Sequence, residues 1–250
     1  MVPVELPRIM GHRGAAAEAP ENTLTSVRRV ADCGATWVEL DVMLTGDDVP
    51  VLFHDDSLKR TTGQAGLMAE TTFDVVRHLD AGRWFGPAFE GEPLPSLEDT
   101  LALIRELGIG LNLEIKPSKG RARVTAERAM DIVARHWPQG GPPLLVSSFE
   151  TVCLAVAQAR RPDLPRGLIT LWPSAQQLQL LAGLACASYH CYHKRLRAKT
   201  AAAVKAAGYA LACFTVNDAS EAQRLFDMGV DCVITDDPRR LLQTFGQNPL

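Results

Sequence analysis

The stretch WVELDVMLTGDDVPVLFH, residues 37–54, decides how the first part of the chain folds. Two apolar, strand-forming runs are joined there by only four residues, TGDD, whereas a crossover between parallel strands needs about a dozen or more. The second run must therefore fold back on the first as an antiparallel hairpin. A two-residue loop at positions 46–47 places His54 opposite Glu39, and a loop at positions 47–48 places it opposite Asp41. Either register brings one imidazole and two carboxylates together near the carboxyl end of a strand.

Short β-rich runs alternate with longer helical patterns along the rest of the chain. This alternation predicts βαβ units and a parallel sheet, and eight such runs are the number found in a TIM (β/α)8 barrel. An open doubly wound sheet is the alternative. Barrels of this kind use about 250 residues as one domain, so we expect a single domain over residues 1–250. The eight runs are RIMGHRG (8–14), WVELDV (37–42), LNLEIK (111–116), LLVSSF (144–149), RGLIT (166–170), ASYHCY (187–192), ALACFTV (210–216) and CVITDDP (232–238).

Residues 56–95 are too many for one loop between a strand and a helix, so they predict a small inserted subdomain. A short helix is expected over residues 72–79, followed by the aromatic, glycine-rich run GRWFGPAFEGEP. Trp84, Phe85 and Phe89 either pack this insertion onto the barrel or form a lid over the site.

Helix boundaries can also be placed from the sequence. Asn22 is expected to cap a helix that presents Leu24 and Val27 on one face and ends at Gly34. Ser96 and Asp99 resemble a capping box at the start of another helix.

Composition excludes several classes of protein. The chain is 46% hydrophobic and 22% charged, which is typical of a globular domain and not of a disordered or coiled-coil protein. A net charge of −3 offers no broad attraction to nucleic acid or to anionic membranes, so phosphate recognition must be local. No apolar run is long enough to span a bilayer, and no secretory signal pattern opens the sequence. The six cysteines are scattered singly, so we expect buried thiols and a cytoplasmic protein, although a secreted protein stripped of its signal would look similar.

Polar residues gather at the carboxyl ends of the first three predicted barrel strands, where TIM barrels hold their active sites. Residues two apart on a strand point to the same side, so Glu39 lies beside Asp41 and Glu114 beside Lys116. The full set is His12, Arg13, Glu39, Asp41, His54, Glu114 and Lys116.

Three carboxylates in a barrel mouth repel one another and need a cation. Hard oxygen ligands suit Mg²⁺ or Ca²⁺ better than zinc. The alternative is that Glu39 or Glu114 merely pairs with Arg13 or Lys116. One ion pair would not explain why Asp41 and both histidines are there as well.

Several blocks together resemble the glycerophosphodiester phosphodiesterase family, in the order and spacing of that family over about residues 8–240. The blocks are HRGAAAEAPENTLTS (12–26), VELDVMLTGDDVPVLFHDDSLKRTTG (38–63), LDAGRWFG (79–86), LNLEIK (111–116), FTVN (214–217) and TDDP (235–238). The first two blocks alone fix many positions, which makes the resemblance specific. It is similar to the short, single-domain bacterial type.

The resemblance implies a TIM-type barrel with an inserted subdomain and one divalent cation held at Glu39, Asp41 and Glu114. It also implies that His12 and His54 act as acid and base. Arg13 and Lys116 match positions that contact phosphate, and Asn22 matches one that shapes the first loop.

The chain departs from the family pattern in two places. Phe214 stands where the family usually has Trp, at the glycerol end of the substrate. The closing block reads Asp236-Asp237-Pro238, and the sequence leaves open which carboxylate faces the site. We expect Trp84 and Phe214 to form an apolar wall for glycerol. No charged pocket for the departing alcohol is evident from the sequence, so we expect broad tolerance of that alcohol.

The implied reaction is hydrolysis of a phosphodiester such as glycerophosphocholine or glycerophosphoethanolamine to glycerol 3-phosphate and an alcohol. A base must activate the nucleophile on one side and an acid must protonate the leaving alkoxide on the other. The sequence leaves open which histidine is the acid, and whether water or the glycerol 2-hydroxyl attacks first. His190 and His193 lie on a predicted strand that ends at the mouth, and one of them could approach the substrate.

Two other functions fit the same chain. A lysophospholipase D or related lipid phosphodiesterase needs an exposed apolar or basic rim, for which the aromatic insertion is the only candidate in the sequence. A catalytically silent phosphate-binding barrel is disfavoured because both histidines and all three acidic residues are present.

Overall fold

A computed structural model describes residues 1–246 and shows a closed barrel of parallel strands. The strand order is β1-β9-β8-β7-β6-β5-β4-β2, and β1 also pairs with β2, which closes the barrel and excludes the open doubly wound sheet. All eight predicted barrel strands are present. They are β1 (Ile9–His12), β2 (Trp37–Leu44), β4 (Gly110–Ile115), β5 (Leu144–Ser148), β6 (Arg166–Thr170), β7 (Ser188–Tyr192), β8 (Ala210–Phe214) and β9 (Cys232–Thr235).

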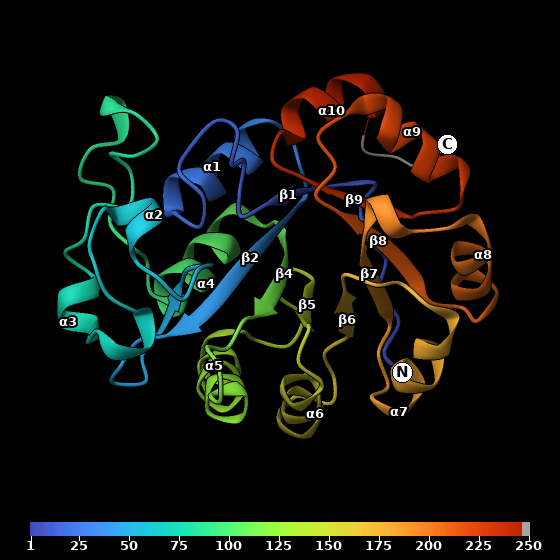
Figure 1. Ribbon diagram of the computed structural model, residues 1–250, viewed down its shortest axis with the longest axis horizontal. Helices are drawn as coiled ribbons and strands as arrows, with labels where there is room; N and C mark the ends of the chain where they lie inside the picture. Colours follow the sequence, from blue (N-terminus) through green and yellow to red (C-terminus); the bar gives the residue numbers. More distant parts are fainter. Residues whose placement is uncertain (247–250) are drawn as a thin grey trace.

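Helices follow the strands and cover the outside of the barrel (Figure 1). Because both faces of each strand are buried, the strands carry nearly continuous apolar runs. The helices outside the insertion are α1 (Leu24–Asp32), α4 (Leu97–Leu107), α5 (Ala122–His136), α6 (Thr151–Arg160), α7 (Leu178–Gly183), α8 (Ala198–Ala206), α9 (Ala219–Asp227) and α10 (Pro238–Phe245). Short 3₁₀ turns occupy η3 (Ala175–Gln177) and η4 (His193–Arg195).

A small apolar cluster lies beneath the polar end of the barrel. Met10, Leu145, Ala212 and Ile234, from four different strands, pack together with Trp37. Met10 precedes His12 by two positions on β1, so both side chains point to the same side of the strand. The cluster therefore fills the barrel below the level at which the polar side chains begin.

The hairpin after β2 forms as expected, but both expected registers are wrong. Strand β3 (Pro50–Leu52) pairs antiparallel with β2, with Leu44 opposite Pro50 and Val42 opposite Leu52. The turn has three residues, 46–48, and Asp48 takes a positive φ of 64° at its end. This turn is one residue longer than the two-residue turn that the sequence predicted. The pairing of β3 with β2 therefore falls between the two expected registers. His54 then lies beyond the paired strand and directly opposes neither Glu39 nor Asp41.

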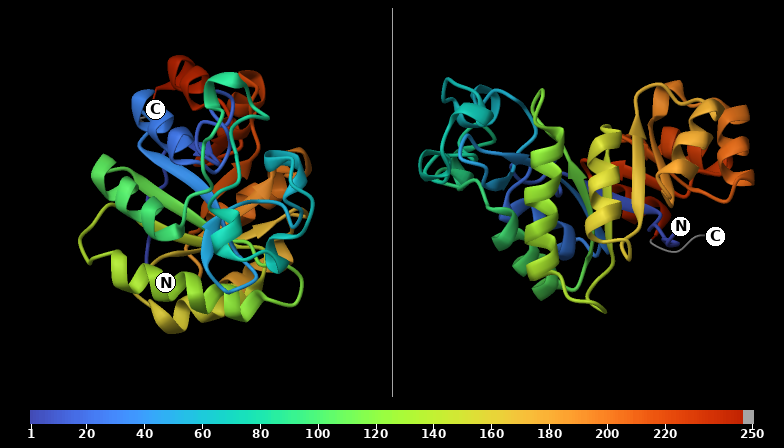
Figure 2. Two further views of the ribbon diagram at one scale, coloured as in Figure 1. Left: turned by 90° about the vertical axis from the view of Figure 1, so that its left-hand side faces the viewer. Right: turned by 90° about the horizontal axis from the view of Figure 1, so that it is seen from below.

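The insertion between β3 and α4 carries only short helical turns around an aliphatic core of its own. These are α2 (Lys59–Thr62), η1 (Met68–Glu70), α3 (Phe73–Val76) and η2 (Pro87–Phe89). Met43 and Phe53 from the hairpin pack against Leu58, Met68 and Val76. The helix expected over residues 72–79 is therefore present but short. Figures 1 and 2 show the insertion on one side of the barrel and α7 and α8 on the opposite side.

The aromatic run of the insertion packs mainly on itself. Trp84 contacts Phe85, and Phe85 contacts Phe89, with edge-to-face ring centroids 5.6 and 5.2 Å apart. Trp84 is 41% exposed and its indole N–H donates to the Ala81 carbonyl at 2.8 Å. These rings are neither the core of the insertion nor part of the cavity described below.

The cap of α1 differs from the expectation. Thr23, not Asn22, is the N-cap residue, and its hydroxyl accepts a hydrogen bond from the Ser26 amide at 3.1 Å. Asn22 has a φ of 54° and turns its side chain toward the barrel instead. The exit at Gly34 has the expected left-handed conformation, with a φ of 83°. Ser96 caps α4 as expected, accepting from the Asp99 amide.

Gly14 and Gly34 allow a matched test of the first loop. Both have positive φ values, 95° and 83°. A methyl group at Gly14 would meet the Ser26 backbone at 2.8 Å, whereas a methyl group at Gly34 would meet no other part of the described chain within 4 Å. We expect Gly34→Ala to cost about 1 kcal/mol, the conformational penalty alone, and Gly14→Ala to cost roughly 2 kcal/mol more. Urea unfolding of both variants measures the difference. Equal destabilisation would show that the loop relaxes around the added methyl group.

Candidate active site

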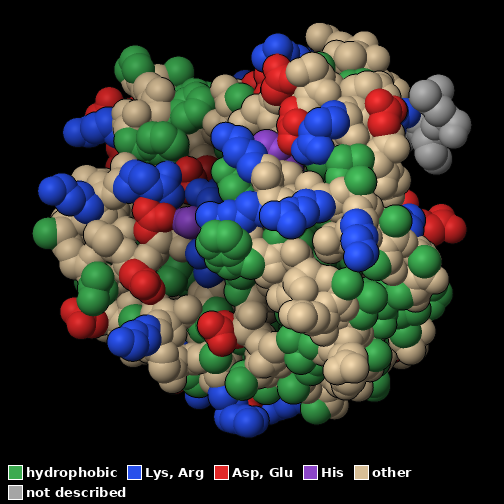
Figure 3. Space-filling model, turned by 45° about the vertical axis from the view of Figure 1, so that its right-hand side comes forward, with side chains coloured by type: hydrophobic (Ala, Val, Ile, Leu, Met, Phe, Trp, Pro, Cys, Tyr) green, Lys and Arg blue, Asp and Glu red, His purple; other side chains and the backbone are tan. Residues whose placement is uncertain are grey.

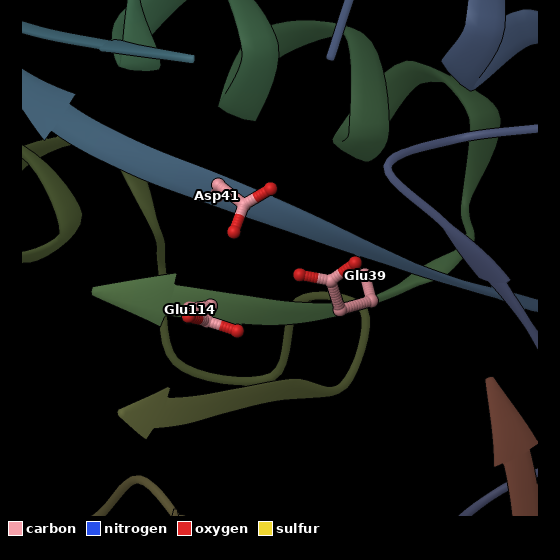
Figure 4. A group of neighbouring side chains, drawn as sticks. All are labelled: Glu39, Asp41 and Glu114. Carbon is pink, nitrogen blue, oxygen red and sulfur yellow. The ribbon is translucent and has the colours of Figure 1, made fainter. Parts of the chain in front are cut away.

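Three carboxylates converge at the carboxyl ends of neighbouring strands. Glu39 and Asp41 project from β2 and Glu114 from β4, and Figure 4 shows them pointing toward one another. One oxygen from each lies within 4.8 Å of the others, and all three residues are buried. The convergence follows from register, because Asp41 lies beside Glu114 in the parallel pair of β2 and β4.

Two cations and two amides hold this cluster, one amide being the Arg13 backbone N–H, which donates to Glu39 Oε2 at 3.0 Å. Arg13 Nε lies 3.4 Å from Asp41 Oδ2, and Lys116 Nζ lies 3.5 Å from Glu114 Oε1 and 3.8 Å from Asp41 Oδ1. The Asn22 amide donates to Asp41 Oδ2 at 2.9 Å, and its carbonyl oxygen accepts from the Asp41 backbone at 3.1 Å. Most of these cations and hydrogen-bond donors stabilise the negative charge of Asp41.

The three carboxyl groups differ in pKa for that reason. Burial raises the pKa of Glu39 well above its ordinary value, and the charges of Asp41 and Glu114 raise it further. Burial, followed by the charge of Asp41, raises the pKa of Glu114 to about 7. Burial also opposes ionisation of Asp41, but Arg13 and Lys116 outweigh it and lower that pKa. The site thus holds more negative charge than its own residues neutralise. Ion pairing of Glu39 or Glu114 alone does not account for the cluster.

His12, at the end of β1, stands beside the carboxylates and has a carboxylate partner of its own. Its Nδ1 lies 2.6 Å from Asp236 Oδ1, and its Nε2 lies 4.0 Å from Glu39 Oε2. Asp236 also accepts from the Asn217 amide at 2.6 Å and follows β9, the strand next to β1. A carboxylate on Nδ1 fixes the tautomer and leaves Nε2 directed at the site. The closing block thus contributes Asp236, whereas Asp237 caps α10.

His54 has an equivalent arrangement. Its Nδ1 lies 2.6 Å from Asp55 Oδ1, and Arg60 in the insertion donates to the same carboxylate from Nε at 2.6 Å. Arg60 also donates to Glu21, which in turn accepts from Arg13 at 2.8 Å. Burial lowers the pKa of His54, although the charge of Asp41 opposes the shift. A continuous chain of ion pairs therefore connects the insertion to the first barrel loop.

All seven predicted polar residues line one cavity of about 600 Å³. Its apolar wall comes from Phe149, Ile169, Leu171 and Phe214, and Phe149 and Phe214 are in edge-to-face contact at 6.1 Å. Phe214 thus lines the same cavity as the polar residues. Trp84 does not line this cavity, because the aromatic run folds onto itself within the insertion.

The four remaining histidines divide into two pairs. His190 and His193 both line the cavity, while His78 and His136 lie on surface helices or turns. His190 is 1% exposed, with Nε2 2.9 Å from Ser188 Oγ. His193 Nδ1 lies 2.6 Å from Glu221 Oε1.

Sequence reasoning missed several residues that shape the site. Asp55 follows His54 directly, so its position in the sequence could have predicted that it is the carboxylate partner of His54. For Asp236, the sequence does not show whether the carboxylate faces the site. The contribution of Glu21 and Arg60 has no local signal, because the residues are far apart in the chain and meet only in the folded protein.

Comparison with known proteins agrees with this geometry. The model of the glycerophosphoryl diester phosphodiesterase family matches residues 12–240. The chain belongs to this family. The enzyme is similar to the Bacillus subtilis protein YhdW (33% identity, over 92% of this chain and 94% of that one). It is also similar to a glycerophosphodiester phosphodiesterase of Caldanaerobacter subterraneus (29% identity, over 94% and 96%).

A structural relative is an Oleispira antarctica phosphodiesterase solved in complex with the product sn-glycerol-3-phosphate. It is 39% identical, covers 95% of this chain and 96% of its own, and superposes with a TM-score of 0.92. The enzyme described here is accordingly a phosphoric diester hydrolase on a TIM barrel. None of its described helices has the length and apolar character needed to cross a bilayer.

His190 links the stability of the enzyme to pH. Burial lowers its pKa from 6.5 to about 4, so between these values the unfolded chain binds a proton that the folded enzyme does not. Stability therefore falls as pH falls through this window, by about 2 kcal/mol from pH 7 to pH 5. Urea unfolding of His190→Gln should lose this part of the pH dependence, while His78→Gln should retain it. An unchanged pH slope in His190→Gln would contradict the assignment.

Proposed function

We propose that the enzyme hydrolyses glycerophosphodiesters, such as glycerophosphocholine or glycerophosphoethanolamine, to glycerol 3-phosphate and an alcohol, with one divalent cation and two histidines. The observation that carries the proposal is a single cavity that holds three buried carboxylates and two histidines, each with its own carboxylate partner. The product bound to the Oleispira antarctica relative supports the glycerol 3-phosphate side of the reaction.

The carboxylate cluster fits a divalent cation. Its ligand atoms are all oxygens from Glu39, Asp41 and Glu114, which is the donor set of Mg²⁺ or Ca²⁺. Glu114 Oε1 is buried and, among the described residues, accepts no hydrogen bond. Its neighbouring cation is Lys116, whose Nζ lies 3.5 Å away, and a metal ion would supply the closer partner that a buried carboxylate oxygen needs. When bound, the cation would neutralise charge on the nonbridging phosphate oxygens.

The two histidines supply the proton transfers. Their Nδ1 atoms are held by Asp236 and Asp55, so each Nε2 is available to the substrate. One Nε2 removes a proton from the attacking hydroxyl, and the other donates a proton to the departing alkoxide. Either assignment of acid and base fits this geometry, as does attack by water or by the glycerol 2-hydroxyl.

Two side chains are available to the phosphodiester itself. Arg13 and Lys116 face the cavity beside the carboxylates, and a guanidinium and an ammonium there neutralise the negative charge of the phosphate oxygens. Phe149 and Phe214 offer the carbon atoms of glycerol an apolar wall. Phe214 is therefore retained as a substrate contact, and Trp84 is not.

The remaining part of the proposal concerns the cellular location of the enzyme and the partners that it binds. The six cysteines are all free, and Cys33 is the only one not buried. This supports a reducing, cytoplasmic location. The substrate is a small molecule, and the net charge of −3 supports neither nucleic-acid binding nor stable membrane association.

The decisive experiment is metal-dependent release of glycerol 3-phosphate from glycerophosphocholine by the purified enzyme. Activity should disappear on exhaustive chelation, return with Mg²⁺ or Ca²⁺, and leave the circular dichroism spectrum unchanged throughout. Full activity after chelation, with metal content verified, would refute the metal-dependent mechanism.

Metal binding should release protons. Glu39 and Glu114 have raised pKa values, that of Glu114 about 7, so part of the site is protonated near neutral pH and must ionise to bind a cation. Affinity for Mg²⁺ or Ca²⁺ should therefore rise from pH 6 to pH 8. Calorimetry in buffers of different ionisation enthalpy measures the protons released. Glu114→Gln should release fewer and should lower kcat at least a hundredfold. Metal binding without proton release would be the contrary result.

Asp236 and Asp237 form a matched pair of variants. Asp236→Asn should reduce kcat/KM by about tenfold to a hundredfold and shift one limb of its pH profile, because His12 loses the carboxylate that holds its Nδ1. Asp237→Asn should leave both unchanged, since Asn also caps a helix well. A lower rate with an unmoved pH profile would assign Asp236 a purely structural role.

A further inference from the structure

A second cavity, of about 490 Å³, adjoins the active site on the side of the barrel opposite the insertion. The two cavities share Lys194, and the neighbouring residues Leu171 and Trp172 line one cavity each. Six residues account for its polar and aromatic lining: Trp172, Ser174, Lys194, Arg195, Arg197 and Thr200. The second cavity is therefore a direct neighbour of the active site at the mouth of the barrel.

The second cavity is cationic and contains no carboxylate. Among the described residues, Lys194, Arg195 and Arg197 form no ion pair. The cations on the other side of the site are all paired: Arg13 with Asp41 and Glu21, Arg60 with Glu21 and Asp55, and Lys116 with Asp41 and Glu114. Figure 3 shows Lys and Arg side chains gathered beside a histidine and exposed hydrophobic side chains. In a chain of net charge −3, three unpaired cations around one hollow attract an anion.

Arg195 is held in position to bind such an anion. Its guanidinium carbon lies 3.4 Å from the Trp172 ring centroid and 5.4 Å from that of Tyr192. Its NH1 donates to the Leu171 carbonyl at 3.2 Å, and within residues 1–246 its other N–H groups donate to no further acceptor. A stacked guanidinium loses little freedom on binding and presents paired donors that match phosphate or carboxylate. Trp172, 69% exposed, has a role in this arrangement as the wall that supports Arg195.

We propose that the second cavity binds a second anionic group, a phosphate monoester or a carboxylate, on the alcohol of the glycerophosphodiester. The enzyme then prefers diesters whose alcohol is anionic over those whose alcohol carries an ammonium group, which Lys194, Arg195 and Arg197 repel. This inference rests on the proposed function and narrows its substrate class. It replaces the expectation of broad tolerance, because the sequence alone revealed no charged pocket.

The test compares two substrates that differ only in the second anion: glycerophosphoinositol and glycerophosphoinositol 4-phosphate. The wild-type enzyme should have a kcat/KM at least tenfold higher for the phosphorylated substrate, and glycerophosphocholine should be the poorest of the three. Arg195→Gln should reduce that preference at least fivefold, mainly through KM, and Arg195→Lys should restore part of it.

Lys199→Gln is the matched control, because Lys199 is an exposed cation of α8 outside the cavity. It should keep the full preference. A wild-type ratio near one, an unchanged ratio in Arg195→Gln, or an equal loss in Lys199→Gln would each overturn the proposal. Failure of the proposed function is distinct, since none of the three diesters would then be hydrolysed.

Discussion

Mutual repulsion among three buried carboxylates is the constraint on which the rest of this structure depends. Glu39, Asp41 and Glu114 bring oxygens within 4.8 Å of one another at the polar end of the barrel. Burial adds a desolvation cost to that repulsion, because no bulk water screens the charges. Such a cluster persists only if the surrounding chain supplies positive charge and donors at fixed positions. The first loop of the barrel supplies most of them, through Arg13 and Asn22, both of which take positive φ values.

The same constraint explains why the insertion is attached where it is. Arg60 joins Asp55, the partner of His54, to Glu21, the partner of Arg13. One ion-pair chain thus orients a histidine and a cation that come from different loops of the chain. The insertion therefore contacts the active site through charge, while Trp84, Phe85 and Phe89 pack mainly against one another. A lid role for those aromatics is not needed to explain their presence.

The two sides of the mouth differ in how their charges are balanced. On the insertion side each described cation that faces the site has a carboxylate partner, and the three buried carboxylates still leave an excess of negative charge. On the side of β6 and β7 the cations of the second cavity have none among the described residues, and Arg195 is fixed by aromatic stacking instead. The paired cations lie beside the carboxylates and the reacting phosphodiester, whereas unpaired cations in a hollow attract a further anion. This difference is the physical basis for separating the reacting phosphodiester from the group that selects the substrate.

The sequence by itself determined the order of the strands, the hairpin and the identity of the central residues. Strand alternation and the period of two place Glu39 with Asp41 and Glu114 with Lys116 without any knowledge of tertiary contacts, because these relations are local. The tertiary structure decided the rest. The turn at 46–48 has three residues, so the hairpin register differs from both registers that a two-residue turn predicts. Asn22 binds Asp41 and does not cap the helix that follows it. Three further features depend on residues that are far apart in the sequence and meet only when the barrel closes. These are the choice between Asp236 and Asp237, the ion-pair chain from Arg60 to Arg13, and the cavity around Arg195. No local sequence pattern predicts such contacts.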